Sequence, residues 1–198
     1  MNNTFSLVAP TVDFVEVPSE AVELLIGCGN SREKRLDANR SNIWKNVYTL
    51  DIDPSCNPDV VWNLDDLPLP FEDETFEEIH AYEVLEHCGK QGDWRFFFAQ
   101  FAEFWRILKP GGMFYATTPC WDAVWAWGDP GHTRVFTPGT LNFLSQDAYK
   151  RDVGKTMMTD YRGVWPHDFQ IAGAQETNGQ FCFVLRKPDP ATDEAPAA

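Results

Sequence analysis

The sequence predicts an α/β fold with a doubly wound, mostly parallel sheet of about seven strands. Short runs rich in Val, Ile and Leu alternate with a longer stretch of helical periodicity, a glycine turn follows the first run, and acidic residues end the second. This alternation is typical of βαβ units. The 198 residues suit one domain, which we place at residues 1–187, and the apolar-poor tail 188–198 is predicted to be disordered.

The first half of the chain supplies four of the predicted strands. Residues 22–26 form a buried strand that ends in Gly27-Cys28-Gly29, and residues 47–52 form a second strand with acidic residues at its end. The connection between them is short, and we expect a crossover helix of only a few turns over residues 31–36. Residues 59–62 and 77–82 are expected to be the third and fourth strands.

The second half contains the clearest helix, over residues 93–108. Its large apolar residues recur every three or four positions on one face, which indicates packing against the sheet; they are Trp94, Phe97, Phe101, Phe104, Trp105 and Leu108. Asp93 can cap its start, and Pro110-Gly111-Gly112 ends it. Residues 113–118 and 181–186 are predicted strands, and a further helix is predicted over 137–144.

Composition limits the function classes. Thirty acidic and sixteen basic residues give a formal net charge of −14, which disfavours a nucleic-acid substrate. The basic segment around Arg32, Lys34, Arg35, Arg40 and Lys45 is interpreted as a solvated surface. The five cysteines are scattered and are predicted to be reduced thiols. Without a signal sequence or a long apolar run, the chain is expected to be soluble and cytoplasmic, with no membrane contact.

Gly27, Gly29 and Asp51 form the pattern of a nucleoside-binding site. Glycines let the backbone approach a ligand closely, and a carboxylate at the end of the second strand can accept hydrogen bonds from both ribose hydroxyls. Dinucleotide-binding enzymes require a third glycine where this chain has Arg32, so a nicotinamide-dependent dehydrogenase is disfavoured.

Four ordered motifs resemble the class I S-adenosylmethionine-dependent methyltransferases, in particular the type 11-like branch with a short first crossover. They are LLIGCGN at 24–30, LDIDP at 50–54, NLDDLPLPF at 63–71 leading to YEVLEH at 82–87, and RILKPGG at 106–112. The resemblance implies a Rossmann-like sheet whose last strand is antiparallel, with S-adenosyl-L-methionine as the cofactor.

The resemblance also implies the cofactor-binding residues. In that family the glycine turn lies by the methionine and ribose, Asp51 by the ribose, Ile52 by the adenine ring, and the loop after the third strand by the adenine edge. The full set of positions is Gly27, Cys28, Gly29, Asn30, Asp51, Ile52, Asn63, Leu64, Asp65, Tyr82 and Glu83. Asn63 departs from the acidic residue common there, and Asp65 is a possible substitute.

The run Glu83-Val84-Leu85-Glu86-His87 resembles the E-x-x-E-H metal site of ubiquinone-biosynthesis O-methyltransferases and small-RNA 2′-O-methyltransferases. Those families provide a further histidine, whereas the position one turn after His87 is Gln91. We therefore assign no metal site and expect a capped helix start with a buried, structural His87.

The acceptor end of the site is the least determined. His132 is the favoured general base, ahead of His167, His87 and Glu83. It lies in the loop 121–133, whose three tryptophans form either an acceptor lid or a cover over the core or a subunit contact. We expect methyl transfer to a hydroxyl of a small molecule or sugar. A non-catalytic cofactor-binding subunit and a metal-assisted RNA methyltransferase remain the alternatives.

Overall fold

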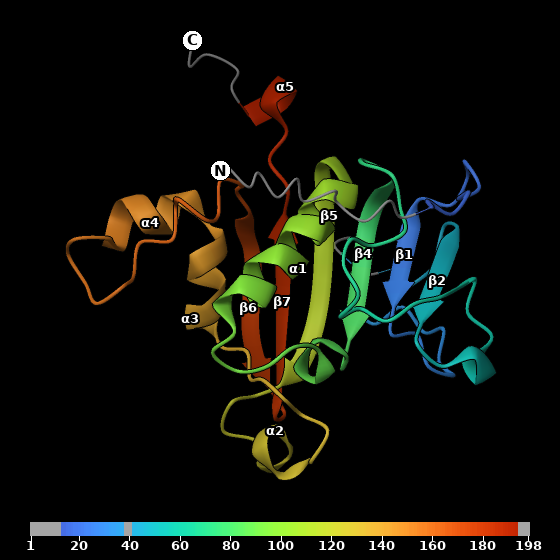
Figure 1. Cartoon of the computed structure of the whole chain (residues 1–198), viewed down its shortest axis with the longest axis horizontal. Coiled ribbons are helices and arrows are strands. Elements are labelled where there is room, and N and C mark those ends of the chain that lie inside the picture. Colours follow the sequence, from blue (N-terminus) through green and yellow to red (C-terminus); the bar gives the residue numbers. More distant parts are fainter. Residues whose placement is uncertain (1–12, 38–40, 194–198) are drawn as a thin grey trace, which may run out of the picture.

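The computed structural model describes residues 13–37 and 41–193, which form one seven-stranded sheet in the order β3-β2-β1-β4-β5-β7-β6 (Figure 1). The strands are β1 Glu23–Ile26, β2 Val47–Asp51, β3 Val60–Val61, β4 Phe76–Tyr82, β5 Leu108–Pro119, β6 Gln170–Thr177 and β7 Gln180–Arg186. Strands β1 to β5 pair in parallel, and β7 runs antiparallel to both β5 and β6. The predicted α/β fold class and antiparallel last strand are confirmed.

The carboxyl ends of β1, β2 and β4 meet at one edge of the sheet. Ile26 at the end of β1 pairs with Leu50 of β2 on one side and with Ala81 of β4 on the other. The residues that follow these pairs therefore emerge side by side. They carry the glycine turn, the acidic strand end and the E-x-x-E-H run, so the topology gathers three of the four sequence motifs at this edge.

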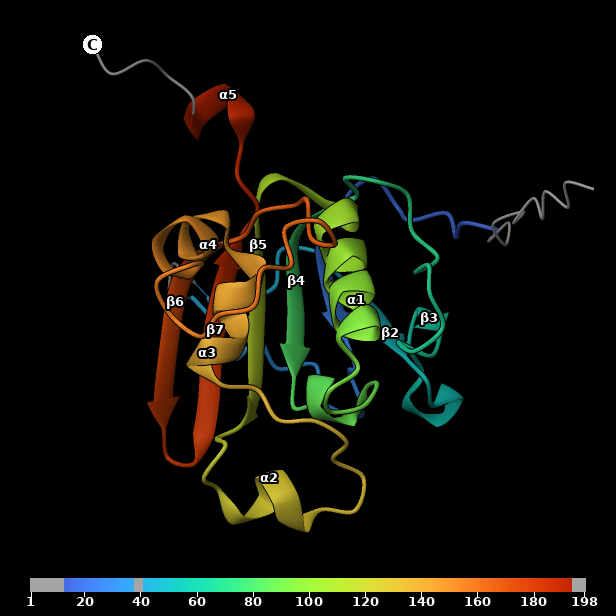
Figure 2. The same cartoon turned by 60° about the vertical axis from the view of Figure 1, so that its left-hand side comes forward.

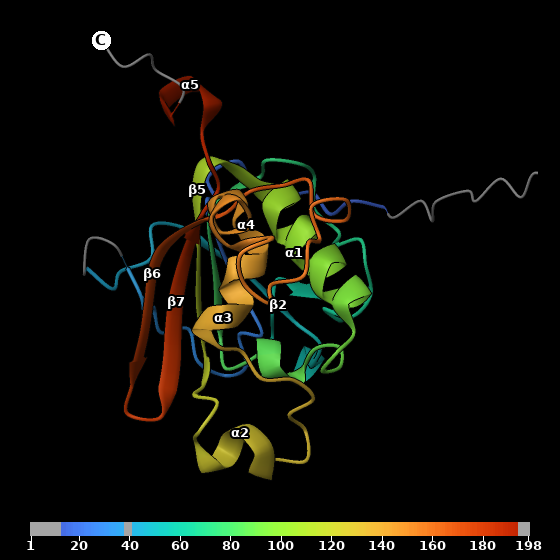
Figure 3. The same cartoon turned by 90° about the vertical axis from the view of Figure 1, so that its left-hand side faces the viewer.

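The main helices cover one face of the sheet, as Figure 3 shows for α1 Trp94–Ile107, α3 Pro138–Leu141 and α4 Gln146–Asp152. Asp93 caps α1 by accepting a hydrogen bond from the amide of Phe96 at 3.1 Å. The inward face of α1 is fully buried on the sheet, through Phe98, Phe101, Phe104 and Ile107. This confirms the predicted core-facing helix. These side chains belong to the main hydrophobic core between the helices and the sheet.

The opposite face carries an irregular segment where a crossover helix was expected. Residues 31–37 have no regular structure, and Leu36 and Trp44 pack on Leu25, Cys28 and Tyr82. The segment is held by side chains that bind the sheet, since Lys34 forms ion pairs with strand glutamates. The expectation of a helix was wrong because these contacts replace helical hydrogen bonds. The interpretation of the basic segment as a solvated surface was also wrong at Lys34, which is only 3% exposed.

Several elements were not predicted. Strand β6 has the sequence QIAGAQET, which lacks the alternation of apolar and polar residues that marks a half-buried strand, and it is exposed along most of its length. The remaining elements are short: α2 Val124–Gly128, α5 Pro190–Asp193, and the 3-10 turns η1 Pro54–Cys56, η2 Leu85–His87 and η3 Asn142–Leu144.

The described part of the chain includes residues 188–193 of the tail and all five cysteines. Within the tail, Asp193 of α5 forms an ion pair with Arg186 at 2.7 Å, while 194–198 lie outside the described residues. All five cysteines are free thiols, as predicted. Among the described residues, no helix has the length and apolar character needed to cross a bilayer.

Candidate active site

A cavity of about 310 Å³ opens at the carboxyl edge of β1, β2 and β4. Most of the predicted cofactor residues line it: Gly27, Gly29, Asp51, Ile52, Asn63, Leu64, Asp65 and Glu83. Cys28, Asn30 and Tyr82 are not among the lining residues. Residues from three separate sequence motifs thus share one concave site, which is the expected form of a small-molecule pocket.

The glycine turn is set by its backbone. Gly27 has φ +60°, and a Cβ there would lie 2.3 Å from Cγ2 of Val84, so only glycine fits between β1 and the loop after β4. Gly29 also has a positive φ, and its amide donates to Oδ2 of Asp51 at 2.7 Å. The turn and the acidic strand end therefore hold each other at the cavity wall.

Asp51 ends β2 and lines the cavity. It is 8% exposed, and its Oδ1 accepts a hydrogen bond from the amide of Asp53 at 2.9 Å. Ile52, although apolar, is 63% exposed and lines the cavity. Asp53 instead serves the turn, since its side chain accepts from the amide of Ser55 at 2.8 Å.

The loop after β3 forms the opposite wall. Oδ1 of Asn63 accepts from the amide of Asp65 at 3.1 Å, and Oδ1 of Asp65 accepts from the amide of Gly89 at 3.0 Å. Asp65 thereby ties this loop to the chain after β4. Trp62 also lines the wall, with its Nε1 donating to the carbonyl of Asp66 at 2.8 Å. Trp62 was missed, although an aromatic residue at a strand end was a readable signal.

Glu83 and Tyr82 leave β4 in different directions. Glu83 has φ +54°, a strained value for this residue type, and its Oε1 accepts from Nε2 of Gln180 at 2.7 Å. This conformation places Glu83 in the cavity wall. The hydroxyl of Tyr82 accepts from the amides of Arg35 and Leu36 at 3.3 and 3.1 Å, on the face that carries the irregular segment.

Glu86, His87 and His132 form a cluster in which one ligand atom from each lies within 4.8 Å of the others. The His87 and His132 rings are 4.6 Å apart, and His87 lines the cofactor cavity. His87 is exposed, so the expected buried, structural histidine was wrong. Its Nδ1 lies 3.1 Å from the carbonyl oxygen of Gly131. Because a carbonyl only accepts, Nδ1 is the nitrogen of His87 that carries a proton in this contact.

Glu86 has an unusual environment for a carboxylate. It is 2% exposed, and among the described residues no other residue donates a hydrogen bond to either of its side-chain oxygens. Burial raises the pKa of Glu86 to about 8. Nδ1 of His132 is likewise buried without a partner in the described chain. The site thus contains an orphaned carboxylate and an orphaned imidazole nitrogen next to each other, which is uncommon in a folded protein.

The other sequence candidates lie apart from this cluster. His167 stacks on Trp105 with ring centroids 4.4 Å apart, and burial lowers its pKa. In the loop after β5, Trp125 and Trp127 of α2 are each 68% exposed. Figure 2 shows α2 beyond the carboxyl edge of the sheet. The interpretation that these tryptophans cover the core was therefore wrong.

Comparison with known proteins gives one family match. Residues 24–116 match the family model described as a methyltransferase domain. No curated protein matches the sequence.

Three solved structures share the fold. A SAM-dependent methyltransferase from Archaeoglobus fulgidus has 14% identity and a TM-score of 0.50, over 85% of this chain and 87% of that one. The 1,6-didemethyltoxoflavin-N1-methyltransferase of Burkholderia thailandensis, with its substrate and S-adenosylhomocysteine, has 16% identity and a TM-score of 0.50, covering 85% and 72%. The N-methyltransferase NodS of Bradyrhizobium japonicum, bound to S-adenosylhomocysteine, has 14% identity and a TM-score of 0.50, covering 85% and 79%.

The sequence match and the fold agree with the cavity described above. The cofactor is S-adenosylmethionine, since the matched segment includes the glycine turn and Asp51. The match of residues 24–116 to a methyltransferase domain, together with the fold, supports a class I S-adenosylmethionine-dependent methyltransferase.

Proposed function

We propose that this enzyme transfers the methyl group to a hydroxyl oxygen of a small-molecule or sugar acceptor, with His132 as the general base. The observation that carries the proposal is the Glu86–His87–His132 cluster at the rim of the cofactor cavity. A hydroxyl must lose its proton as it attacks the methyl group, and an imidazole with a free nitrogen is suited to accept that proton at neutral pH.

The exposed tryptophans of α2 support a small, partly apolar acceptor. Trp121, Trp125 and Trp127 lie in the loop that also carries His132, and Nε1 of Trp127 donates to the carbonyl of Trp121 at 2.7 Å. An aromatic loop next to the base can cover an acceptor and exclude water from the reacting atoms. The acceptor lid thus remains our proposal for this loop.

The first test is calorimetric titration with S-adenosylhomocysteine, because cofactor binding must be established before turnover is interpreted. The native protein should bind it, and Asp51→Ala should lose at least tenfold in affinity, about 1.4 kcal/mol. A matched change outside the cavity, Asp53→Ala, should bind nearly as well as the native protein. Equal affinity in all three proteins would contradict the assignment of the ribose site.

The second test addresses the acceptor. Labelled S-adenosylmethionine is incubated with pools of polyols, sugars, phenols and primary amines, because two of the similar structures are N-methyltransferases. We expect label in hydroxyl compounds, and we expect His132→Gln to reduce kcat by about 10²–10⁴ with little change in cofactor affinity. Methylation of amines alone, or full activity of His132→Gln, would refute the proposal.

A second candidate is the metal-assisted form of the same reaction. Glu86 and the two imidazoles offer oxygen and nitrogen donors within 4.8 Å of one another, and the orphaned Glu86 carboxylate fits a bound cation better than an empty interior. A divalent cation held by Glu86, His87 and His132 would orient and acidify a hydroxyl of the acceptor. Activity abolished by EDTA and restored by Mg²⁺ or Mn²⁺ favours this form; activity indifferent to EDTA favours His132 acting alone.

The remaining alternatives are weaker. An RNA methyltransferase would need a cationic surface. In this chain, however, Lys34 is buried in ion pairs, and Arg32 donates hydrogen bonds to the carbonyls of Gly29 and Cys56. With a net charge of −14, we propose no nucleic-acid partner. A non-catalytic cofactor-binding subunit would bind the cofactor but methylate no compound in any acceptor pool. The acceptor screen therefore distinguishes it from an enzyme.

A further inference from the structure

A second, larger cavity of about 540 Å³ lies on the helix-bearing face, between the start of α1, the chain from residue 134 to α3 and η3, and residues 159–161. None of the residues that line it also lines the cofactor cavity. The proposed methyl transfer does not use it, because an acceptor must contact the cofactor. This cavity therefore requires its own explanation.

Six aromatic residues contribute to its wall. Tyr161 is the centre of the wall: its ring lies 5.6 Å from Trp94, 5.2 Å from Phe98 and 5.9 Å from Phe143, measured between centroids. Phe97 and Phe136 are the other aromatic residues in the lining. Rings fixed against one another in this way form a preorganised apolar surface that suits a flat ring.

The polar group of greatest interest in the lining is Arg134. It is 6% exposed, its Nε donates to the carbonyl of Leu85 at 2.8 Å, and its Nη2 donates to Oε1 of Gln100. In the described part of the chain, no carboxylate forms an ion pair with its guanidinium, although Asp65 and Glu86 are near enough to interact with it electrostatically. A buried cation without a paired anion is costly, and a bound anion would remove that cost.

Other groups add positive potential at the cavity. Lys90 is in the lining, and so is the first turn of the fourteen-residue helix α1. The only acidic residue in the lining is Asp93, and its Oδ1 already accepts from the amide of Phe96. The chain has a net charge of −14, so a cavity with more cations than anions and with aromatic walls differs from the rest of the molecule and favours an anionic ligand.

We propose that this cavity is a second binding site, for a planar aromatic ligand that carries a carboxylate or a similar anionic group. The ring lies among Phe98, Phe143 and Tyr161, and the anion pairs with Arg134. Such pairing is directional, because a guanidinium can donate two parallel hydrogen bonds to one carboxylate.

The site adjoins the active centre. The amides of Thr133 and Arg134 both donate to the carbonyl oxygen of Glu86, at 2.8 and 3.3 Å. The segment 133–134 is thus shared between the wall of this cavity and the backbone of the Glu86–His87–His132 cluster. A ligand on Arg134 would contact the chain that holds His132, although it would not contact the cofactor.

The test is calorimetric titration with 2-naphthoate and with the neutral 2-naphthamide, which has the same ring system. We expect naphthoate to bind at least about tenfold more tightly than the amide, because it alone offers a charge to Arg134. Equal affinity would overturn the anion-pairing part of the proposal. Failure of naphthoate to bind a protein that still binds S-adenosylhomocysteine would overturn the site itself.

Two variants locate the ligand. Arg134→Gln keeps a donor for the carbonyl of Leu85 and should bring the two ligands to similar affinity. Val135→Trp fills the cavity and should abolish the binding of both ligands. Unchanged binding of S-adenosylhomocysteine would show that this variant is folded. Trp125→Ala is the matched control for adsorption on α2 and should bind naphthoate like the native protein. Full binding by Val135→Trp, or loss in Trp125→Ala, would place the ligand elsewhere and refute the assignment.

Discussion

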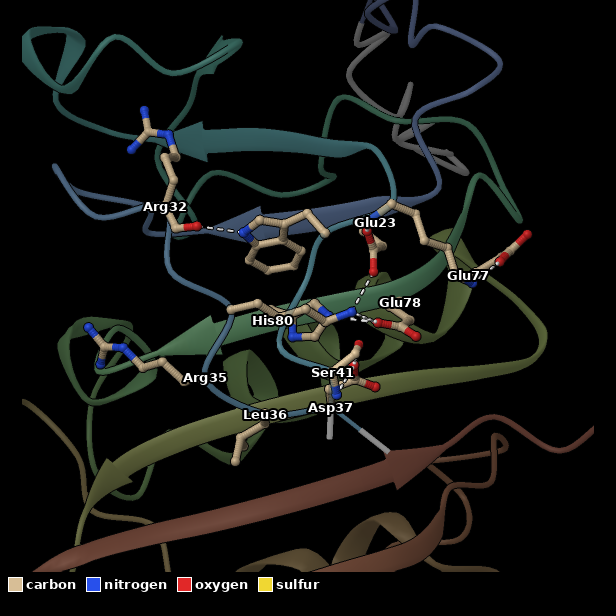
Figure 4. Close-up of polar contacts among 12 residues, drawn as sticks. Glu23, Arg32, Arg35, Leu36, Asp37, Ser41, Glu77, Glu78 and His80 are labelled. Carbon is tan, nitrogen blue, oxygen red and sulfur yellow. Dashed lines mark hydrogen bonds and ion pairs between the residues drawn. The ribbon is translucent and has the colours of Figure 1, made fainter. Parts of the chain in front are cut away.

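Two clusters of carboxylates and imidazoles lie on this sheet, and they differ in how completely their polar atoms are paired. Glu23 and Glu78 form ion pairs with Lys34, and His80 contacts Glu78, whereas Glu86, His87 and His132 have no cation among them. Figure 4 shows the contacts that Glu23, Glu78 and His80 make at the first cluster. Both groups bring ligand atoms within 4.8 Å of one another, so proximity alone does not distinguish a structural site from a functional one.

The difference lies in what each carboxylate accepts. Glu23 accepts from Nζ of Lys34 and from the amide of Lys45, each at 2.5 Å. Glu78 accepts from Lys34 at 2.7 Å and lies 3.0 Å from Nε2 of His80. Glu86 has no such donor in the described structure. The first cluster is complete without a ligand, and the second is not, which is the pattern expected of a structural network and a reaction site respectively.

The largest expected effect is from Lys34→Met, which should destabilise the fold by about 3–5 kcal/mol because two buried carboxylates lose their counter-charge. Urea unfolding followed by tryptophan fluorescence measures this. The matched control is Lys45→Met, whose ion pair with Glu77 is exposed and 3.5 Å long, and which should change stability by less than about 1 kcal/mol. Similar losses in both variants would show that the first cluster is not a structural network.

The next effect separates the clusters by their response to cations. If Glu86, His87 and His132 bind Mn²⁺, saturating the site at 100 times Kd should stabilise the protein by about 2.7 kcal/mol. Glu86→Gln should lose this response, and Glu78→Gln should keep it although its baseline stability is lower. Thermal unfolding with and without Mn²⁺ measures both. A response that disappears in Glu78→Gln instead would reverse the roles we assign.

Acid sensitivity should come from the paired cluster. The hydrogen bond from His80 and the contact with Lys34 lower the pKa of Glu78 to about 2, below its ordinary value of 4.5. A lowered folded-state pKa gives stability that is present above pH 4.5 and is lost as the pH falls towards 2. We expect the native protein to exceed Glu78→Gln by about 2 kcal/mol at pH 6 and by much less at pH 3. A constant difference between the two proteins over this range would contradict the shift.

These comparisons also show what the sequence could and could not predict. Gly27, Gly29 and Asp51 were predictable because their roles depend on local backbone chemistry at strand ends. The partnership of His132 with His87 was not, since it depends on how a loop 45 residues further along folds back across the edge of the sheet. Lys34 was read as solvated because no local pattern marks an ion pair formed with two strands.

The smallest effect concerns Tyr82. The family resemblance places it at the cofactor, whereas in the structure its hydroxyl contacts His80 and the irregular segment. Its hydroxyl is 2.6 Å from Nδ1 of His80 and accepts from two backbone amides of the irregular segment, so it belongs to the paired cluster by contact. Tyr82→Phe should therefore cost about 1–2 kcal/mol of unfolding free energy, by leaving those groups without a partner. Its affinity for S-adenosylhomocysteine should stay within about twofold, because the hydroxyl lies on the face away from the cavity. Calorimetry and urea unfolding on one preparation give both quantities. A variant of native stability that bound the cofactor poorly would return Tyr82 to the cofactor site and weaken the division between the two clusters.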